Sequence, residues 1–65
     1  MKFQEFLVTF HLSRGKMQQV IYEESWSILR NRLRHDIADA NIHYIKIDGT
    51  IIFTHHIKSF DIKRV

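Results

Sequence analysis

Hydrophobic and polar residues alternate along the first part of the chain. Between residues 6 and 12 every second side chain is apolar, which is typical of a strand with one buried face. A polar stretch that contains Gly15 follows, and glycine suits the left-handed position of a hairpin loop. Residues 17–23 then favour a second, antiparallel strand, although the spacing of their apolar side chains would also fit the start of a helix.

An amphipathic helix is predicted next. Ser25 or Ser27 can cap its N-terminus, and the glutamates just before them suit the positive end of the helix dipole. We expect Asn41 to end the helix in the left-handed conformation. Between these limits, apolar residues recur every three or four positions and form one stripe that would cover a sheet: Trp26, Leu29, Leu33, Ile37 and Ala40.

The last third of the chain carries a hairpin pattern. Two apolar runs, residues 42–47 and 51–53, flank the pair Asp48-Gly49. Both central residues of a type I′ turn need a positive φ, which glycine adopts freely and aspartate tolerates. The register that follows from this turn pairs Ile47 with Thr50, Lys46 with Ile51, Ile45 with Ile52 and Tyr44 with Phe53.

Both faces of this predicted hairpin are apolar. One face carries Ile45, Ile47 and Ile52. The opposite face carries the four residues that we predict to form a protein interface: Ile42, Tyr44, Ile51 and Phe53. A hairpin with two apolar faces has to be covered on both sides, so we expect its own helix on one side and another sheet or another copy of the chain on the other.

After the hairpin the alternation breaks at Thr54-His55-His56, which indicates a bulge or tight turn between residues 54 and 58. A short further strand is expected over residues 59–64. The element order β-β-α-β-β, with this optional fifth strand, predicts the α+β class: one helix packed on a small, mostly antiparallel sheet, in a single domain over residues 1–65. A chain of this length buries only about 60% of its unfolded surface, so self-association would help to stabilise it.

Composition narrows the function classes. The chain has no cysteine, so neither a disulfide nor a thiolate zinc site is expected, and no apolar run approaches the length that crosses a bilayer. We therefore expect a cytoplasmic protein without a membrane partner. The net charge of +3 permits contact with nucleic acid or with an acidic protein, but it requires neither.

Signals of catalysis and of metal binding are weak. Five histidines occur, but the adjacent pair His55-His56 would point to opposite faces of a strand, and the spacing of the others does not bring three ligands together. The glycines occur singly, and no serine lies in a nucleophile-elbow motif. We predict no enzyme activity, no cofactor, no metal and no small-molecule substrate.

Two binding hypotheses remain. The first is a homodimer that acts through protein–protein interaction, with the apolar hairpin face as its interface and an unidentified protein as a further partner. The alternative is a small nucleic-acid-binding protein that uses the basic surface of its helix, where Arg32 could also pair with Asp36. The helix residues of this alternative are Arg30, Arg32, Arg34 and His35.

The segment 45–53, followed by His56-Ile57 and Phe60-Asp61-Ile62, resembles the ending of small uncharacterised accessory proteins from phages and prophages of Gram-positive bacteria. The resemblance covers only this C-terminal hairpin and the strand after it. It implies an accessory protein of a mobile element, a class in which small folds bind and inhibit host proteins or bind nucleic acid. It assigns no functional residue.

Overall fold

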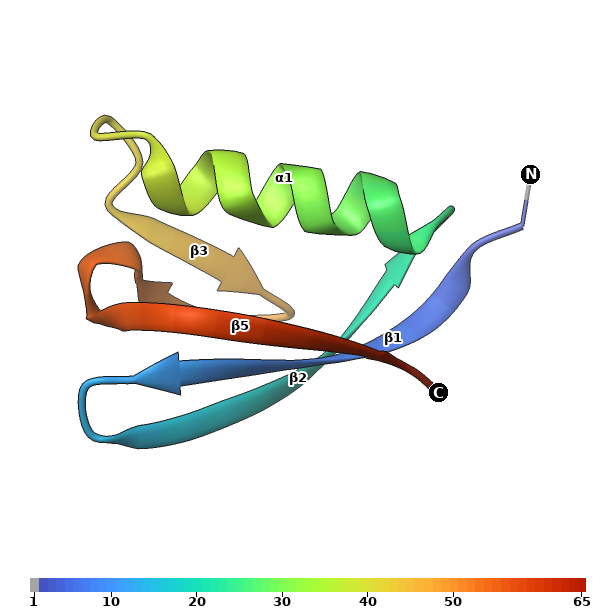
Figure 1. Cartoon of the computed structure of the whole chain (residues 1–65), viewed down its shortest axis with the longest axis horizontal. Coiled ribbons are helices and arrows are strands. Elements are labelled where there is room, and N and C mark those ends of the chain that lie inside the picture. The colour runs from blue at the N-terminus through green and yellow to red at the C-terminus, as the bar shows by residue number, and fades with distance from the viewer. Residues whose placement is uncertain (1) are drawn as a thin grey trace.

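A computed structural model describes residues 2–65 (Figure 1). Over this range the chain forms one helix, five strands and one 3-10 turn, so the predicted α+β class is confirmed. The elements are β1 (Gln4–Leu12), β2 (Gly15–Glu23), α1 (Trp26–Ala38), β3 (Tyr44–Ile47), β4 (Thr50–Phe53), η1 (Thr54–His56) and β5 (Ile57–Arg64). None of the helical structure in residues 2–65 is long and apolar enough to cross a membrane.

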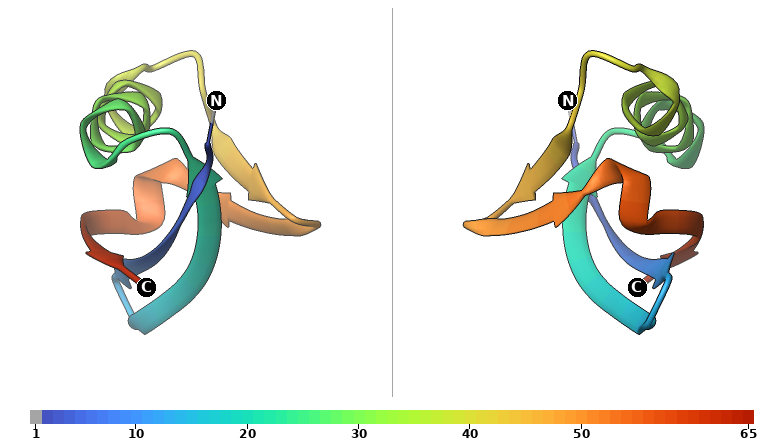
Figure 2. Two further views of the ribbon diagram at one scale, coloured as in Figure 1. Left: turned by 90° about the vertical axis from the view of Figure 1, so that its right-hand side faces the viewer. Right: turned by 90° about the vertical axis from the view of Figure 1, so that its left-hand side faces the viewer.

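The strands form two antiparallel sheets instead of the single sheet expected. One has the order β2-β1-β5, and the other is the hairpin β3-β4 (Figure 2). Helix α1 lies across the larger sheet, and the hairpin projects from the side away from β5. The separation follows from η1, which stands where a bulge was predicted and turns the chain between β4 and β5.

The first two strands follow the predicted pattern. Residues 17–23 are strand and not helix, and Phe6 lies opposite Ile21 in the β1–β2 pair. Gly15 has φ +93°, the left-handed conformation expected at the hairpin loop. The alternating residues Phe6, Val8 and Phe10 point inward from the central strand and are fully buried.

The hydrophobic core joins both sheets to the helix. Burying each large aliphatic or aromatic side chain contributes about 1.5–3 kcal/mol, so this shared cluster holds the two sheets together. It consists of Phe6, Val8, Phe10, Ile21, Leu29, Leu33, Ile45, Ile52 and Ile57.

The helix begins at one of the two predicted caps, but the two end residues of its predicted apolar stripe and its predicted C-terminus are wrong. Ser25 is the N-cap, and its Oγ accepts a hydrogen bond from the Ile28 amide at 3.2 Å. Trp26, the first helical residue, is 46% exposed because only the following turns lie over the sheet. Ala40 lies beyond the last turn. Asn41 does not adopt a positive φ. Instead, its backbone N–H donates to the Asp39 carboxylate at 2.9 Å.

The hairpin register is confirmed. Asp48 and Gly49 have φ values of +50° and +88°, as a type I′ turn requires. Ile45 pairs with Ile52 and Tyr44 with Phe53. At the far end of the hairpin, the buried Thr54 hydroxyl donates to the Ile42 carbonyl at 2.8 Å, which ties η1 to the start of β3.

Candidate interaction surfaces

The outward side of the β3–β4 hairpin exposes three large apolar side chains. Tyr44, Ile51 and Phe53 are 51%, 51% and 49% exposed, whereas their strand neighbours Ile45 and Ile52 belong to the core. The alternation of the two short strands causes this difference, because successive side chains point to opposite faces. We call Tyr44, Ile51 and Phe53 the hairpin face.

The fourth residue predicted for this interface contributes less. Ile42 precedes β3 and is only partly exposed. Lys46 points to the same side as the hairpin face, opposite Ile51, and is exposed. The surface is therefore an apolar patch with a single basic group beside it.

The patch continues into a cluster of aromatic rings that the sequence did not predict. The ring of Phe53 lies 6.3 Å from that of His55 and 6.0 Å from that of His56, and the two imidazoles are 4.2 Å apart. The expectation that the two histidines point to opposite faces is wrong, because η1 is a helical turn and not a strand. In residues 2–65 no three His, Cys, Asp or Glu side chains come together in a way that could hold a metal ion.

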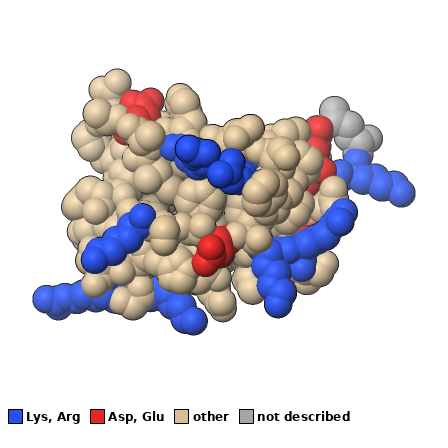
Figure 3. Space-filling view, in the orientation of Figure 1, with Lys and Arg blue, Asp and Glu red and all other residues tan. Residues whose placement is uncertain are grey.

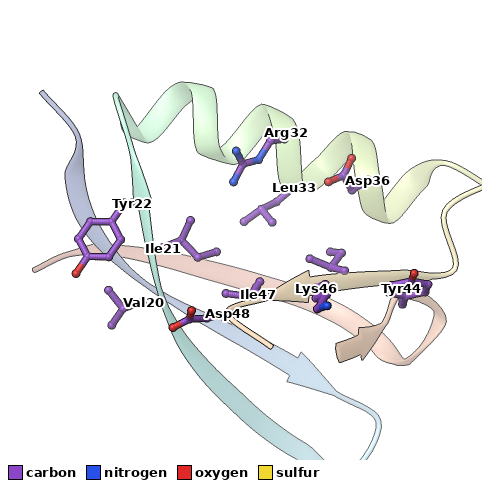
Figure 4. A pocket seen from close by; sticks show the side chains of 11 residues that line it. Val20, Ile21, Tyr22, Arg32, Leu33, Asp36, Tyr44, Lys46, Ile47 and Asp48 are labelled. Carbon is purple, nitrogen blue, oxygen red and sulfur yellow. The ribbon is translucent and has the colours of Figure 1, made fainter. Parts of the chain in front are cut away.

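A cleft of about 590 Å³ separates β2 from β3 (Figure 4). Val20, Ile21 and Tyr22 line it from β2, residues 44–48 line it from β3 and the turn after it, and α1 forms its third side. The two strands are not hydrogen-bonded to each other, and each is the edge of its own sheet. No pattern in the sequence indicates this cleft, because it depends on the angle at which the two sheets meet.

Two side-chain contacts are made by residues at the end of β2. Arg32 pairs with Glu23 at 2.7 Å, and not with Asp36 as predicted, because Glu23 at the end of β2 is nearly buried beside the helix. On the outer side of the larger sheet, the Tyr22 hydroxyl donates to a Glu5 carboxylate oxygen at 2.8 Å. This hydrogen bond and the negative charge of Glu5 raise the pKa of Tyr22 above its usual value of 10.0.

The structure divides the four residues of the predicted nucleic-acid site. The guanidinium of Arg30 lies 5.5 Å from the centre of the Trp26 ring, and Arg34 lines a small cleft between α1 and β5. Arg32 lies on the other flank of the helix, in the β2–β3 cleft. His35 is exposed, and its Nδ1 lies 3.5 Å from a carboxylate oxygen of Asp36. Only Arg30 and Arg34 therefore share a face, because residues four apart lie on the same side of a helix.

Basic side chains gather on the face of the molecule formed by α1 and β5. Figure 3 shows Lys and Arg groups spread over the helix, over β5 and along the lower edge of this face, with only isolated acidic groups between them. Lys58 and Arg64 of β5 face clefts that they share with Arg34 and Trp26, respectively. The sequence signal for this arrangement was the basic character of β5, which could not be placed relative to the helix without the fold.

The sequence matches no protein-family model and no curated protein, and the structure matches no solved structure.

Proposed function

We propose that this chain is a small non-enzymatic binding module that forms a homodimer through the hairpin face. The observation that carries the proposal is the half-exposure of Tyr44, Ile51 and Phe53 on strands whose other side is in the core. Apolar side chains held rigidly at a surface lose unfavourable contact with water when a second surface covers them. A two-fold arrangement lets the same patch cover itself.

The size of the patch sets the strength of the dimer. A large side chain presents roughly 150–250 Å² in all, so three half-exposed ones offer about 300 Å² per copy. At about 25 cal/mol per Å², covering both copies contributes roughly 15 kcal/mol before the cost of association. That cost is an estimated 4–15 kcal/mol or more, and stable interfaces bury about 800 Å² per partner. Because the patch is smaller than a stable interface, we expect a weak dimer, with a Kd between about 1 μM and about 1 mM and with the histidine pair at its rim.

A second copy suits this face better than a strongly charged partner. Of the residues on β3 and β4 that point outward, Lys46 alone carries a charge. A face of this kind gains little from electrostatic attraction and mostly from apolar contact. The cysteine-free composition and the resemblance of segment 45–53 support a cytoplasmic accessory role in a mobile element, with a host protein as a further partner.

The test is light scattering coupled to size exclusion on the wild type and two matched variants. Ile51→Glu places a carboxylate opposite Lys46 in the hairpin face and should give a monomer, because covering this face would then remove two charged groups from water. Ile28→Glu makes the same change at an exposed position of α1, outside the hairpin face and outside the β2–β3 cleft, and should leave the dimer intact. A wild type that stays monomeric at millimolar concentration would refute the proposal, and so would equal loss of the dimer in both variants.

A further inference from the structure

The seam between α1 and β5 holds basic side chains from both elements. Arg34 and Lys58 line a cleft of about 200 Å³ at one end of the seam, together with Ile37 and Phe60. Arg64 lines a second cleft, of about 440 Å³, at the other end. The seam follows β5 over six residue steps, which at about 3.3 Å each extend for about 20 Å. We call Arg30, Arg34, Lys58 and Arg64 the basic seam.

These side chains are not engaged by carboxylates. Among residues 2–65, the only Lys or Arg in an ion pair is Arg32, which lies on the other flank of the helix. Arg64 donates a hydrogen bond to the side-chain oxygen of Gln4, which is neutral. Positive charges without local carboxylate partners attract polyanions, since each contact with a phosphate releases condensed counterions from the polyanion.

Several acidic side chains have partners or positions outside the basic seam. Asp36 and Asp48 line the β2–β3 cleft, and Glu5 accepts from Tyr22 on the outer side of the larger sheet. Asp61 is the exception in β5, but its carboxylate lies 2.7 Å from His11, also on the outer side of that sheet. None of the ion pairs in residues 2–65 therefore involves a residue of the basic seam, although the net charge of the chain is only +3.

An exposed aromatic ring stands at one end of the seam. Trp26 lines the same cleft as Arg64 and is almost half exposed. Arg30 lies over its ring at 5.5 Å, within the range of a cation–π contact that restricts the ring. A flat ring beside guanidinium groups is the combination on which proteins stack the bases of single-stranded nucleic acid while they hold its backbone.

We propose that the basic seam binds single-stranded nucleic acid, with the backbone phosphates along its four basic side chains and a base stacked on Trp26. A duplex fits less well because its bases are already stacked and offer Trp26 no free face. An acidic protein would satisfy the charges but would leave the ring without a partner. The hairpin face projects from the side away from β5, so this site is independent of the proposed dimer interface.

The first measurement is the dependence of the binding affinity on salt concentration. With four phosphate contacts, the slope of log K against log salt for a single strand is about −2.8, so the affinity should fall roughly 50-fold between about 50 mM and about 200 mM salt. The probe is a labelled oligo(dT) of about 15 nucleotides, followed by fluorescence anisotropy. Because Trp26 is the only tryptophan, quenching of the protein's own fluorescence should accompany binding. Salt-dependent binding without quenching would overturn the stacking arrangement, and no binding at low salt would overturn the site.

Matched variants distinguish the effect of the basic seam on affinity from the effect of net charge. Arg34→Glu with Lys58→Glu should lower the affinity at low salt at least ten-fold and reduce the slope to about half. Lys16→Glu with Lys63→Glu makes the same change in net charge on the outer side of the larger sheet and should retain most of the affinity. Equal losses in the two pairs would overturn the proposal. Circular dichroism and an unchanged urea midpoint check that each variant is folded.

Two further comparisons test the kind of ligand. Trp26→Ala should weaken oligo(dT) binding about ten-fold, whereas Trp26→Phe should retain most of it because a ring remains. A DNA duplex with as many base pairs as the oligo(dT) has nucleotides should bind at least ten-fold more weakly than oligo(dT). A polyglutamate with the same number of residues should also bind at least ten-fold more weakly. Equal binding of polyglutamate would show a general polyanion surface and contradict the proposal. Ile51→Glu should leave oligo(dT) binding unchanged, so the two proposals can fail separately.

Discussion

Replacement of Leu33 by alanine tests how α1 holds the two sheets together. Leu33 is 1% exposed and belongs to the core cluster, in which side chains of the larger sheet and of the hairpin meet. The change removes three carbon atoms, whose transfer free energy is about 2.5 kcal/mol, and the unfilled cavity adds to this cost. Alanine favours helix, so the loss reports packing and not a weakened helix.

We expect the Leu33→Ala variant to lose about 3 kcal/mol of unfolding free energy. A domain of 65 residues has roughly 3–10 kcal/mol in total, so the variant should be close to unfolding at room temperature. Urea titration followed by Trp26 fluorescence measures the difference. It should be made in the Ile51→Glu background, so that dimerisation does not add to the stability of either protein.

Ile28 provides the matched control on the same helix. It is 47% exposed, so Ile28→Ala should change the unfolding free energy by less than about 0.5 kcal/mol. A cost below about 1 kcal/mol for Leu33→Ala, or an equal cost for both variants, would refute the packing of α1 on the sheets as described.

The remaining predictions concern the turn, the hairpin anchor and one titrating group. Gly49→Ala should cost about 1–2 kcal/mol in urea unfolding, because φ at this position is +88°; an unchanged midpoint would contradict the type I′ turn. Thr54→Val should cost about 1–3 kcal/mol of unfolding free energy, because the Ile42 carbonyl loses its hydrogen-bond donor. The backbone amide of residue 54 should then exchange its hydrogen faster, and an unchanged exchange rate would refute this contact. The raised pKa of Tyr22 means that the Glu5 hydrogen bond stabilises the fold below pH about 10 and that this contribution is lost as the pH rises through the raised pKa. With the other tyrosine replaced by phenylalanine, Glu5→Gln should shift the phenolate absorbance transition to lower pH, and an unmoved transition would contradict this contact.

Patterns local in the sequence predicted most of the secondary structure. The alternation in β1 and the pair Asp48-Gly49 depend on neighbouring residues only, because side-chain direction and turn conformation are set by the backbone at those positions. The exposed hairpin face followed from the same register. Its role as an interface stays a prediction.

Features that depend on the angle between elements could not be predicted in this way. The β2–β3 cleft, the exposure of Trp26 and the Arg32–Glu23 pair all depend on how α1 lies across the sheets. Helix periodicity shows which residues share a stripe, but it does not show where along its length the helix leaves the sheet. In the same way, the position of the basic residues of β5 beside α1 could be known only from the fold.

The central claim, that the hairpin face pairs two copies of the chain, is tested most directly by a dilution series of backbone amide NMR spectra from about 1 mM to about 10 μM. If the hairpin face forms the dimer, the amide chemical shifts of the adjoining histidines and of Tyr44, Lys46, Ile51 and Phe53 should change with concentration. The amide chemical shifts of β5 should stay constant. Spectra that do not change with dilution, or changes centred on another surface, would contradict this claim.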